Sequence, residues 1–482
     1  MRLADVWKFG CATLLMAGSA LAASPTSTPV APTGSAASIP TSLQDALVEV
    51  YSTNPTLLAQ RASLRATDED VPQALAGWRP TVTVSGSYGL DNGVEREGAP
   101  LAFENEKVVT DRAPFTGTLQ LTQPIYKGGA TRANVHKAKD SVYSARATLI
   151  ATEEAQFAQA ISDYVTVIED QQLLALNKNN QQVLEVQLKA TQDQFRVGEL
   201  TQTDVAQAQA ALDGAIAQVA TAAGNLAAAN AAYQHDVGSP PVNLTPPTEL
   251  NIGVANADEV SALAAKNNAN VVAAQFNLAA AQDNVDLQFA GLMPQVSGVL
   301  TGTVTTNQSV GLQQTNDGEA AVQVTIPLYQ GGAEYSKVRQ AKQQVQQAEQ
   351  QLIDARLASV SSAVQAYETL VANQAATVSD RSEVAADQIA LAGVEREALV
   401  GTSTTLDVLI EEQDLLQART SLVQNLAQAV ASSYGVAAAM GQLTARDLAL
   451  NVPLYDETAY YDSVDTALFG VSVPSQGNAG KQ

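Results

Sequence analysis

Residues 124–130 are Pro-Ile-Tyr-Lys-Gly-Gly-Ala, and residues 327–333 are Pro-Leu-Tyr-Gln-Gly-Gly-Ala. Outward from this motif, residues 124–238 align with residues 327–441 without a gap, at a constant offset of 203 positions. Upstream the offset is 214, so the first copy carries 11 extra residues, within the charged stretch Asp91–Asp111, which we expect to be a longer loop. A period of this length indicates one supersecondary unit used twice.

The N-terminus has the pattern of a signal peptide over residues 1–22. Arg2 and Lys8 precede and flank an apolar run that ends in Ala20-Leu21-Ala22, which is typical of exported proteins. Residues 23–40 are expected to be a flexible lead-in. Cys11 is the only cysteine, so the exported chain has neither a disulfide nor a cysteine-bound metal. The net charge of −23 excludes a nucleic-acid-binding protein.

Each half contains two segments of strict two-residue alternation, which predict β-hairpins at residues 81–124 and 295–327. The segments approach the roughly 9–11 residues of a tilted transmembrane strand, and an apolar face opposite a polar one suits a barrel wall. A soluble sandwich is the alternative. Four strands cannot close a barrel, and open edges in lipid are costly, so several chains must share one barrel; three chains give twelve strands.

Two very long helices are the strongest secondary-structure signal. Residues 129–195 and 332–399 contain no internal proline and, apart from Gly393, no internal glycine, so each helix extends to about 100 Å. The helix after each carries a heptad repeat, a coiled-coil seam, through Val205, Leu212, Val219, Leu226 and Tyr233, and through Val408, Leu415, Leu422, Ala429 and Val436.

The predicted fold is therefore an α+β membrane protein, in which a long antiparallel coiled-coil α-helical barrel is continuous with a β-barrel of four strands per chain. The first structural repeat spans residues 41–238 and the second spans residues 259–443, joined by a linker at 239–258. Periodicity stops after Leu443, so the tail 444–482 is expected to be peripheral or partly disordered.

The turn after each long helix has the pattern Val-Gly-x-x-Thr-x-x-Asp, ending at Asp204 and Asp407. Glycine ends the first helix, and Thr-x-x-Asp approaches a capping box. A second interpretation is that these aspartates ring a narrow opening and select cations. Glu411 and its neighbour Glu412 would add negative charge.

The repeated Pro…Gly-Gly motif predicts a strand-to-helix turn, because proline cannot donate to a central β-ladder and paired glycines allow a sharp change of direction. A phosphate cradle is the alternative, but no Walker lysine follows. The turn residues are Pro124, Gly128, Gly129, Pro327, Gly331 and Gly332.

Together with the Gly-x-x-Pro turns at residues 77–80 and 291–294, these motifs resemble the TolC family of outer-membrane efflux and secretion ducts, most closely its type I secretion subgroup. The resemblance implies a homotrimer in outer-membrane lipid whose helical barrel crosses the periplasm. It implies helix tips that dock a periplasmic adaptor linked to an inner-membrane ABC or RND-type pump.

The resemblance also assigns residues. It places gate aspartates at Asp204 and Asp407, and adaptor contacts at Val197, Gly198, Val400, Gly401 and Thr402. Glu199 departs from the family's first tip motif. The arginine and tyrosine that lock the closed end in a well-known member are replaced here by Ser403 and Ala398, so Arg196 and Arg396 are considered as substitutes.

An enzyme is not expected, since the chain has two histidines, His136 and His235, and no nucleophile–base or metal-spaced constellation. No cofactor or metal is expected. The predicted function is passive exit of drugs, other small molecules or a type I secreted protein through a trimeric duct. The rival hypothesis is a structural or adhesive trimeric coiled coil at the cell surface.

Overall fold

The computed structural model describes residues 40–97, 106–309 and 312–473. The predicted signal peptide and lead-in lie outside this range, except for residue 40. The first half contains the elements α1 (Leu43–Thr53), α2 (Pro55–Asp68), α3 (Asp70–Leu75), η1 (Ala76–Trp78), β1 (Thr81–Tyr88), β2 (Asp91–Glu97), β3 (Glu106–Arg112), β4 (Phe115–Lys127), α4 (Ala130–Arg196) and α5 (Gln202–Val237). The second half contains α6 (Ala257–Asn267), α7 (Ala269–Phe289), η2 (Ala290–Leu292), β5 (Gln295–Ser309), β6 (Leu312–Thr325), α8 (Ala333–Leu399), α9 (Thr405–Ala439) and α10 (Ala459–Val464).

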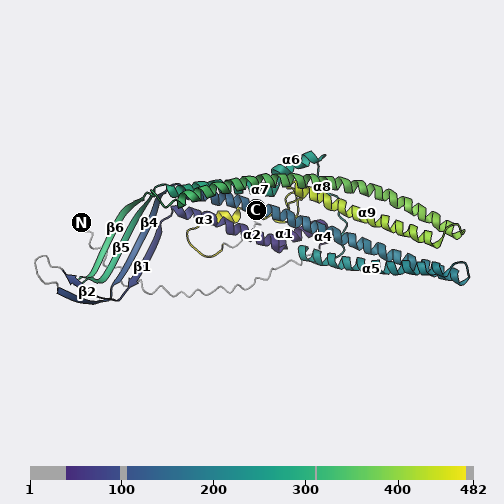
Figure 1. Ribbon diagram of the computed structural model, residues 1–482, viewed down its shortest axis with the longest axis horizontal. Coiled ribbons are helices and arrows are strands. Elements are labelled where there is room, and N and C mark those ends of the chain that lie inside the picture. The colour runs from purple at the N-terminus through teal and green to yellow at the C-terminus, as the bar shows by residue number, and fades with distance from the viewer. Residues whose placement is uncertain (1–39, 98–105, 310–311, 474–482) are drawn as a thin grey trace. The chain divides into compact units, whose positions relative to one another are not determined.

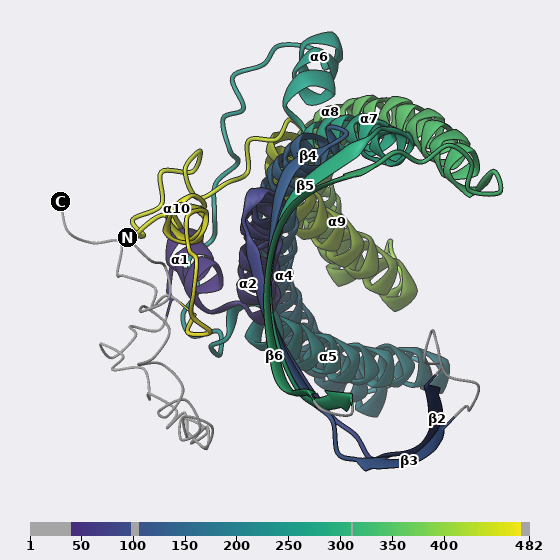
Figure 2. The same ribbon diagram turned by 90° about the vertical axis from the view of Figure 1, so that its left-hand side faces the viewer.

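One antiparallel sheet joins the two halves of the chain in the order β1-β4-β5-β6 (Figure 1). β4 of the first half pairs with β5 of the second, with Leu121 opposite Leu300. β6 ends at Thr325, so Pro327 follows the strand, whereas Pro124 lies inside β4 just before a bulge. The sheet therefore runs from edge strand β1 to edge strand β6, and it curves in the view of Figure 2.

The expectation that residues 91–111 form only a longer loop is wrong. β2 and β3 pair there as a separate two-stranded antiparallel sheet, with Val94 opposite Val109. Arg112 anchors its base by donating from Nη1 to the carbonyl of Gln308 at 2.8 Å. The ladder pairs the backbone groups between the two strands, and the ribbon needs no apolar core face, so its charged sequence lacks the usual strand alternation.

The two long helices α4 and α8 each have 67 residues, or about 100 Å of helix. Each turns back into its partner, α5 or α9, and packs along it (Figure 1). The predicted heptad faces inward in α5, where Leu212 and Tyr233 are buried together with the alanines between the larger heptad residues: Ala208, Ala215, Ala222 and Ala229. In the part of the chain that the structure describes, no helix is long and apolar enough to cross a membrane.

The largest core cluster lies where α1, α2, α4 and the ends of α5 and α9 meet. Tyr164 and Tyr233 are completely buried in it, with ring centroids 6.2 Å apart. The Tyr164 hydroxyl donates to the carbonyl of Thr245 at 2.8 Å. Its repeat partner, Tyr367, donates to the carbonyl of Ala255 at the same distance. The repeated tyrosines thus fasten both ends of the linker to the long helices.

The tail is packed on the core up to Val464, which corrects the sequence-based expectation for that segment, whereas residues 466–473 are exposed. Residues Ala445 and Leu450 are buried in the same core cluster. The Tyr455 amide donates to the Tyr51 hydroxyl at 2.8 Å, and the Arg61 guanidinium lies 4.3 Å and 5.1 Å from the ring centroids of Tyr51 and Tyr455. Aromatic and cation–π contacts hold this segment, so it needs no helical periodicity of its own.

Candidate functional site: the turns between the long helices

The first turn follows the end of α4. Gly198 has φ +85°, and its amide donates to the carbonyl of Phe195 at 3.0 Å. The Glu199 amide closes the turn by donating to the carbonyl of Gln194 at 3.0 Å. Glycine is favoured here because side chains destabilise this left-handed conformation. The geometry leaves the Val197 side chain 72% exposed.

The second turn is similar but more extensively hydrogen-bonded. Gly401 has φ +81°. The amide and the hydroxyl of Thr402 both donate to the carbonyl of Glu397, at 2.9 Å and 3.0 Å. The Ser403 hydroxyl donates to the Glu397 carboxylate at 2.7 Å. Sequence reasoning missed Glu397 as the anchor of this turn, because a single glutamate near a helix end carries no distinctive pattern.

The second turn, like the first, carries exposed apolar side chains at its tip. Leu399 is 84% exposed and Val400 is 75% exposed. A partner surface that covered them would gain free energy roughly in proportion to the apolar area it removes from water. Both turns therefore present apolar groups on a hydrogen-bonded backbone frame.

Both aspartates form complete capping boxes, which confirms the capping interpretation. The Asp204 Oδ2 accepts from the Thr201 hydroxyl at 2.7 Å and from the Thr201 amide at 2.8 Å. The Asp407 Oδ2 accepts from the amide and the hydroxyl of Thr404, both at 2.7 Å. These hydrogen bonds lower the pKa of both carboxyls below the usual aspartate value, so each carries a negative charge at neutral and mildly acidic pH.

The two glutamates beyond Asp407 differ in their surroundings. Glu411 is half-buried, whereas Glu412 is only 8% exposed, and its Oε2 has no hydrogen-bond partner among the described residues. Burial, and secondarily the charge of Glu395, raises the pKa of Glu412 to about 7. The sequence could have indicated the burial of Glu412, because this residue lies between Val408 and Leu415 on the same inward-facing stripe of the helix.

The structure brings the two hairpins together close to their turns. Leu409 of α9 packs on a cluster formed by Leu184, Leu188 and Leu212 of the other hairpin. Within the described chain, no hydrogen bond or ion pair joins Asp204 to Asp407. Arg196, considered above as a substitute lock, pairs with Asp193 on its own helix at 2.8 Å. Its role in closure, like that of Arg396, stays a prediction.

The strand-to-helix turns have left-handed glycines at all four predicted positions. Gly128 and Gly331 have φ +65° and +64°, and Gly129 and Gly332 serve as the N-caps of α4 and α8. The two turns differ in their surroundings: a Cβ on Gly128 would lie 2.6 Å from the carbonyl oxygen of Ala290, whereas nothing lies within 4 Å of one on Gly331.

Comparisons with known proteins place this fold and these turns in a family. A model of the outer membrane efflux protein family matches residues 46–235 and 260–442. The chain is 33% identical over 447 residues to the outer membrane efflux protein BepC of Brucella suis biovar 1 (strain 1330), covering 92% of this chain and 94% of that protein. It is 25% identical over 425 residues to the outer membrane protein TolC of Escherichia coli (strain K12), covering 84% of each.

The fold agrees with these sequence relationships. The crystal structure of the outer membrane protein VceC from Vibrio cholerae matches with a TM-score of 0.71 at 18% identity, over 83% of this chain and 96% of that one. The chain therefore belongs to the outer membrane efflux protein family, and the resemblance to the TolC family is confirmed. It is a protein of the outer membrane and serves as an efflux exit duct; the rival adhesive coiled coil gains no support.

Proposed function

We propose that three copies of this chain form one passive exit duct, with twelve strands in the outer membrane and the long helices enclosing a channel through the periplasm. The observation that carries the proposal is the pair of open sheet edges, β1 and β6. Unpaired backbone groups at an edge are too costly in lipid, so copies must pair edge to edge. Exposed apolar side chains on these edge strands, such as Val82, Val84, Val322 and Val324, suit contact with lipid.

The turns at the far ends of the long helices would then be the docking surface for a periplasmic adaptor. The proposed contacts are Val197, Gly198, Val400, Gly401 and Thr402. The exposed valines and the rigid glycine turns support this proposal, since apolar groups on an ordered backbone bind with little loss of conformational freedom. An ABC or RND-type pump in the inner membrane would supply the energy and a drug, another small molecule or a type I secreted protein as cargo.

In the trimer, Asp204 and Asp407 would contribute six carboxylates to the periplasmic end of the duct, with Glu411 close behind. Their lowered pKa values favour permanent ionisation, and rings of carboxylates favour cations over anions in pores. The capping role and the selectivity role are compatible, since the cap occupies only Oδ2 of each aspartate.

The assembly is tested by native mass measurement of the detergent-purified protein from outer membranes, which should give three chains per particle. A monomer in the soluble periplasm would overturn the proposal.

Selectivity is tested by single-channel recording in planar bilayers. The paired variant Asp204→Asn with Asp407→Asn keeps an acceptor for each cap but removes the charge, and should lower cation selectivity and block by divalent cations. The matched control, Thr201→Ala with Thr404→Ala, breaks the caps but keeps the charge and should retain selectivity. The reverse pattern would leave both aspartates with a capping role alone.

A further inference from the structure

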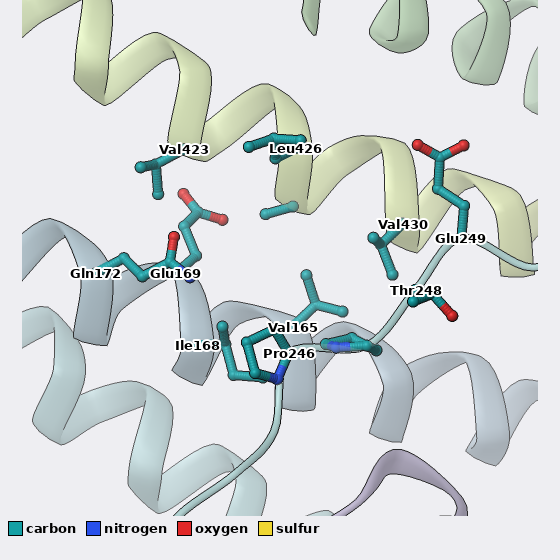
Figure 3. A pocket seen from close by; sticks show the side chains of 12 residues that line it. Val165, Ile168, Glu169, Gln172, Pro246, Thr248, Glu249, Val423, Leu426 and Val430 are labelled. Atoms are coloured by element: carbon teal, nitrogen blue, oxygen red, sulfur yellow. The ribbon is translucent and has the colours of Figure 1, made fainter.

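A cavity of about 500 Å³ lies between α4, α9 and the linker segment of residues 246–249 (Figure 3). Val423, Leu426 and Val430 of α9 form one wall, and Val165 and Ile168 of α4 form the opposite one. Pro246 and Pro247 cover the side between them. The volume lies within the range of roughly 300–1,000 Å³ that holds small-molecule ligands.

The Glu169 carboxylate points from α4 into this apolar cavity, toward α9 (Figure 3). It has no hydrogen bond or ion pair within the described chain, and no lysine or arginine lines the cavity. Burial, and secondarily the charge of Asp170, raises the pKa of Glu169. At the rim, the Glu249 carboxylate accepts from Nε2 of Gln374 at 2.8 Å. Glu169 is half-buried, so its carboxylate is partly desolvated, and a positive charge beside it would interact with it more strongly than in bulk water.

The internal duplication shows that the scaffold does not require these residues. At the offset of 203 positions, the counterpart of Glu169 is Ala372. The counterparts of the large α9 wall residues Val423, Leu426 and Val430 are Ala220, Ala223 and Ala227. Glu169 lies on α4 of the first copy and the apolar wall on α9 of the second, and the equivalent helices α8 and α5 carry only alanines at these four positions. The features that the two copies share therefore require neither the carboxylate nor the large apolar side chains.

We propose that this cavity binds a hydrophobic organic cation, with its positive centre against the Glu169 carboxylate and its apolar groups against α9 and the two prolines. A hard metal cation does not fit, because such ions require several oxygen ligands and the two carboxylates of the lining lie apart in Figure 3, with Glu249 hydrogen-bonded to Gln374 at the rim. A bulky organic cation is weakly hydrated and can bury apolar area while it neutralises the carboxylate. The proposal rests on one chain's geometry and does not depend on the trimeric duct.

Titration calorimetry on the full chain, purified in an uncharged detergent, tests the proposal with tetraphenylphosphonium as the probe. The wild type should bind this cation, and it should not bind tetraphenylborate, an anion of nearly the same shape. Binding should weaken as the pH falls and Glu169 takes up a proton. These measurements require no variant, so they remain informative whatever a substitution does to folding.

Two variants locate the site. Glu169→Gln keeps the side-chain volume and should lower the affinity for tetraphenylphosphonium at least about tenfold, as expected for the loss of one partly buried charge pair. Leu426→Ala installs the residue type of the other copy and should also weaken binding. The matched control is Asp170→Asn, which neutralises the adjacent carboxylate outside the cavity lining and should bind as the wild type does.

Three results would overturn the proposal. One is the absence of tetraphenylphosphonium binding to the wild type, which would mean that a neighbouring copy or a partner segment fills the cavity. Another is equal affinity of the wild type and Glu169→Gln. The third is binding of tetraphenylborate to the wild type with equal affinity. Either the second or the third result would indicate unspecific partition into protein or detergent. Native mass measurement of the same samples separates these results from a failure of the trimeric assembly.

Discussion

The paired glycine turns allow a steric effect to be separated from a conformational one by Gly128→Ala and Gly331→Ala. Both glycines have nearly the same backbone conformation, with φ +65° and +64°. A side chain at such an angle costs roughly 1–2 kcal/mol. At Gly331 that is the whole expected cost, because nothing lies within 4 Å of the added Cβ.

At Gly128 the added Cβ would lie 2.5 Å from Cβ of Met293 and 2.6 Å from the carbonyl oxygen of Ala290. Neither atom belongs to the flexible end of a side chain, so η2 and Met293 must move away from the turn. Overpacking of this kind costs typically a further 1–3 kcal/mol. Gly128→Ala should therefore destabilise the protein by about 2–5 kcal/mol, against about 1–2 kcal/mol for Gly331→Ala.

The assay is the midpoint of thermal denaturation in detergent, followed by circular dichroism at one fixed scan rate, since such unfolding is often irreversible. Gly128→Ala should lower the midpoint by clearly more than Gly331→Ala does. Equal shifts would refute the argument that close approach of η2 to the turn, rather than backbone angle alone, demands glycine at residue 128.

Two further predictions concern buried polar groups. Tyr164→Phe should lower the free energy of unfolding by about 1–3 kcal/mol, because the Thr245 carbonyl loses the hydrogen bond from the buried Tyr164 hydroxyl. Tyr367→Phe removes a more exposed hydrogen bond and should lower it by less. Equal losses of unfolding free energy in urea denaturation would contradict this. Glu412 has a pKa raised from 4.5 to about 7, so its stabilising contribution is complete below pH 4.5 and is lost as pH rises through 7. Glu412→Gln should raise the denaturation midpoint at pH 8 but hardly at pH 5, with Glu411→Gln as control; the same shift at both pH values would disprove the assignment.

Local chemistry explains which parts of the fold were predictable. The sequence predicted long helices over 129–195 and 332–399, and the structure has them at 130–196 and 333–399. Glycine pairs and heptads act within a few residues, so they are visible in the sequence. The pairing of β4 with β5 was not predictable in the same way, because the duplication does not say that the strands of both halves share one sheet. The β2–β3 ribbon was missed because it lacks the alternation that a buried face imposes.

The missed features depend on contacts between distant residues. Arg61 and Tyr455 are far apart in the chain, and nothing near either residue predicts that their side chains stack. The burial of Glu412 was visible as a stripe position, but its environment depends on α8, which supplies Glu395. For Asp204 and Asp407, the same residues serve the cap and the proposed gate, so the pattern alone does not separate the two roles.

A feature present in both halves of the chain would occur six times in the proposed trimer, whereas a feature present in one half would occur three times. The capping boxes at Asp204 and Asp407 have nearly identical hydrogen bonds, so the proposed trimer would contain this cap six times. At the offset of 203 positions, Glu169 corresponds to Ala372 and Glu412 corresponds to Gln209, so neither carboxylate has a counterpart in the other half. A cation held by Glu169 must therefore bind once per chain. Two equivalent sites per chain would place binding in the shared architecture and outside this cavity.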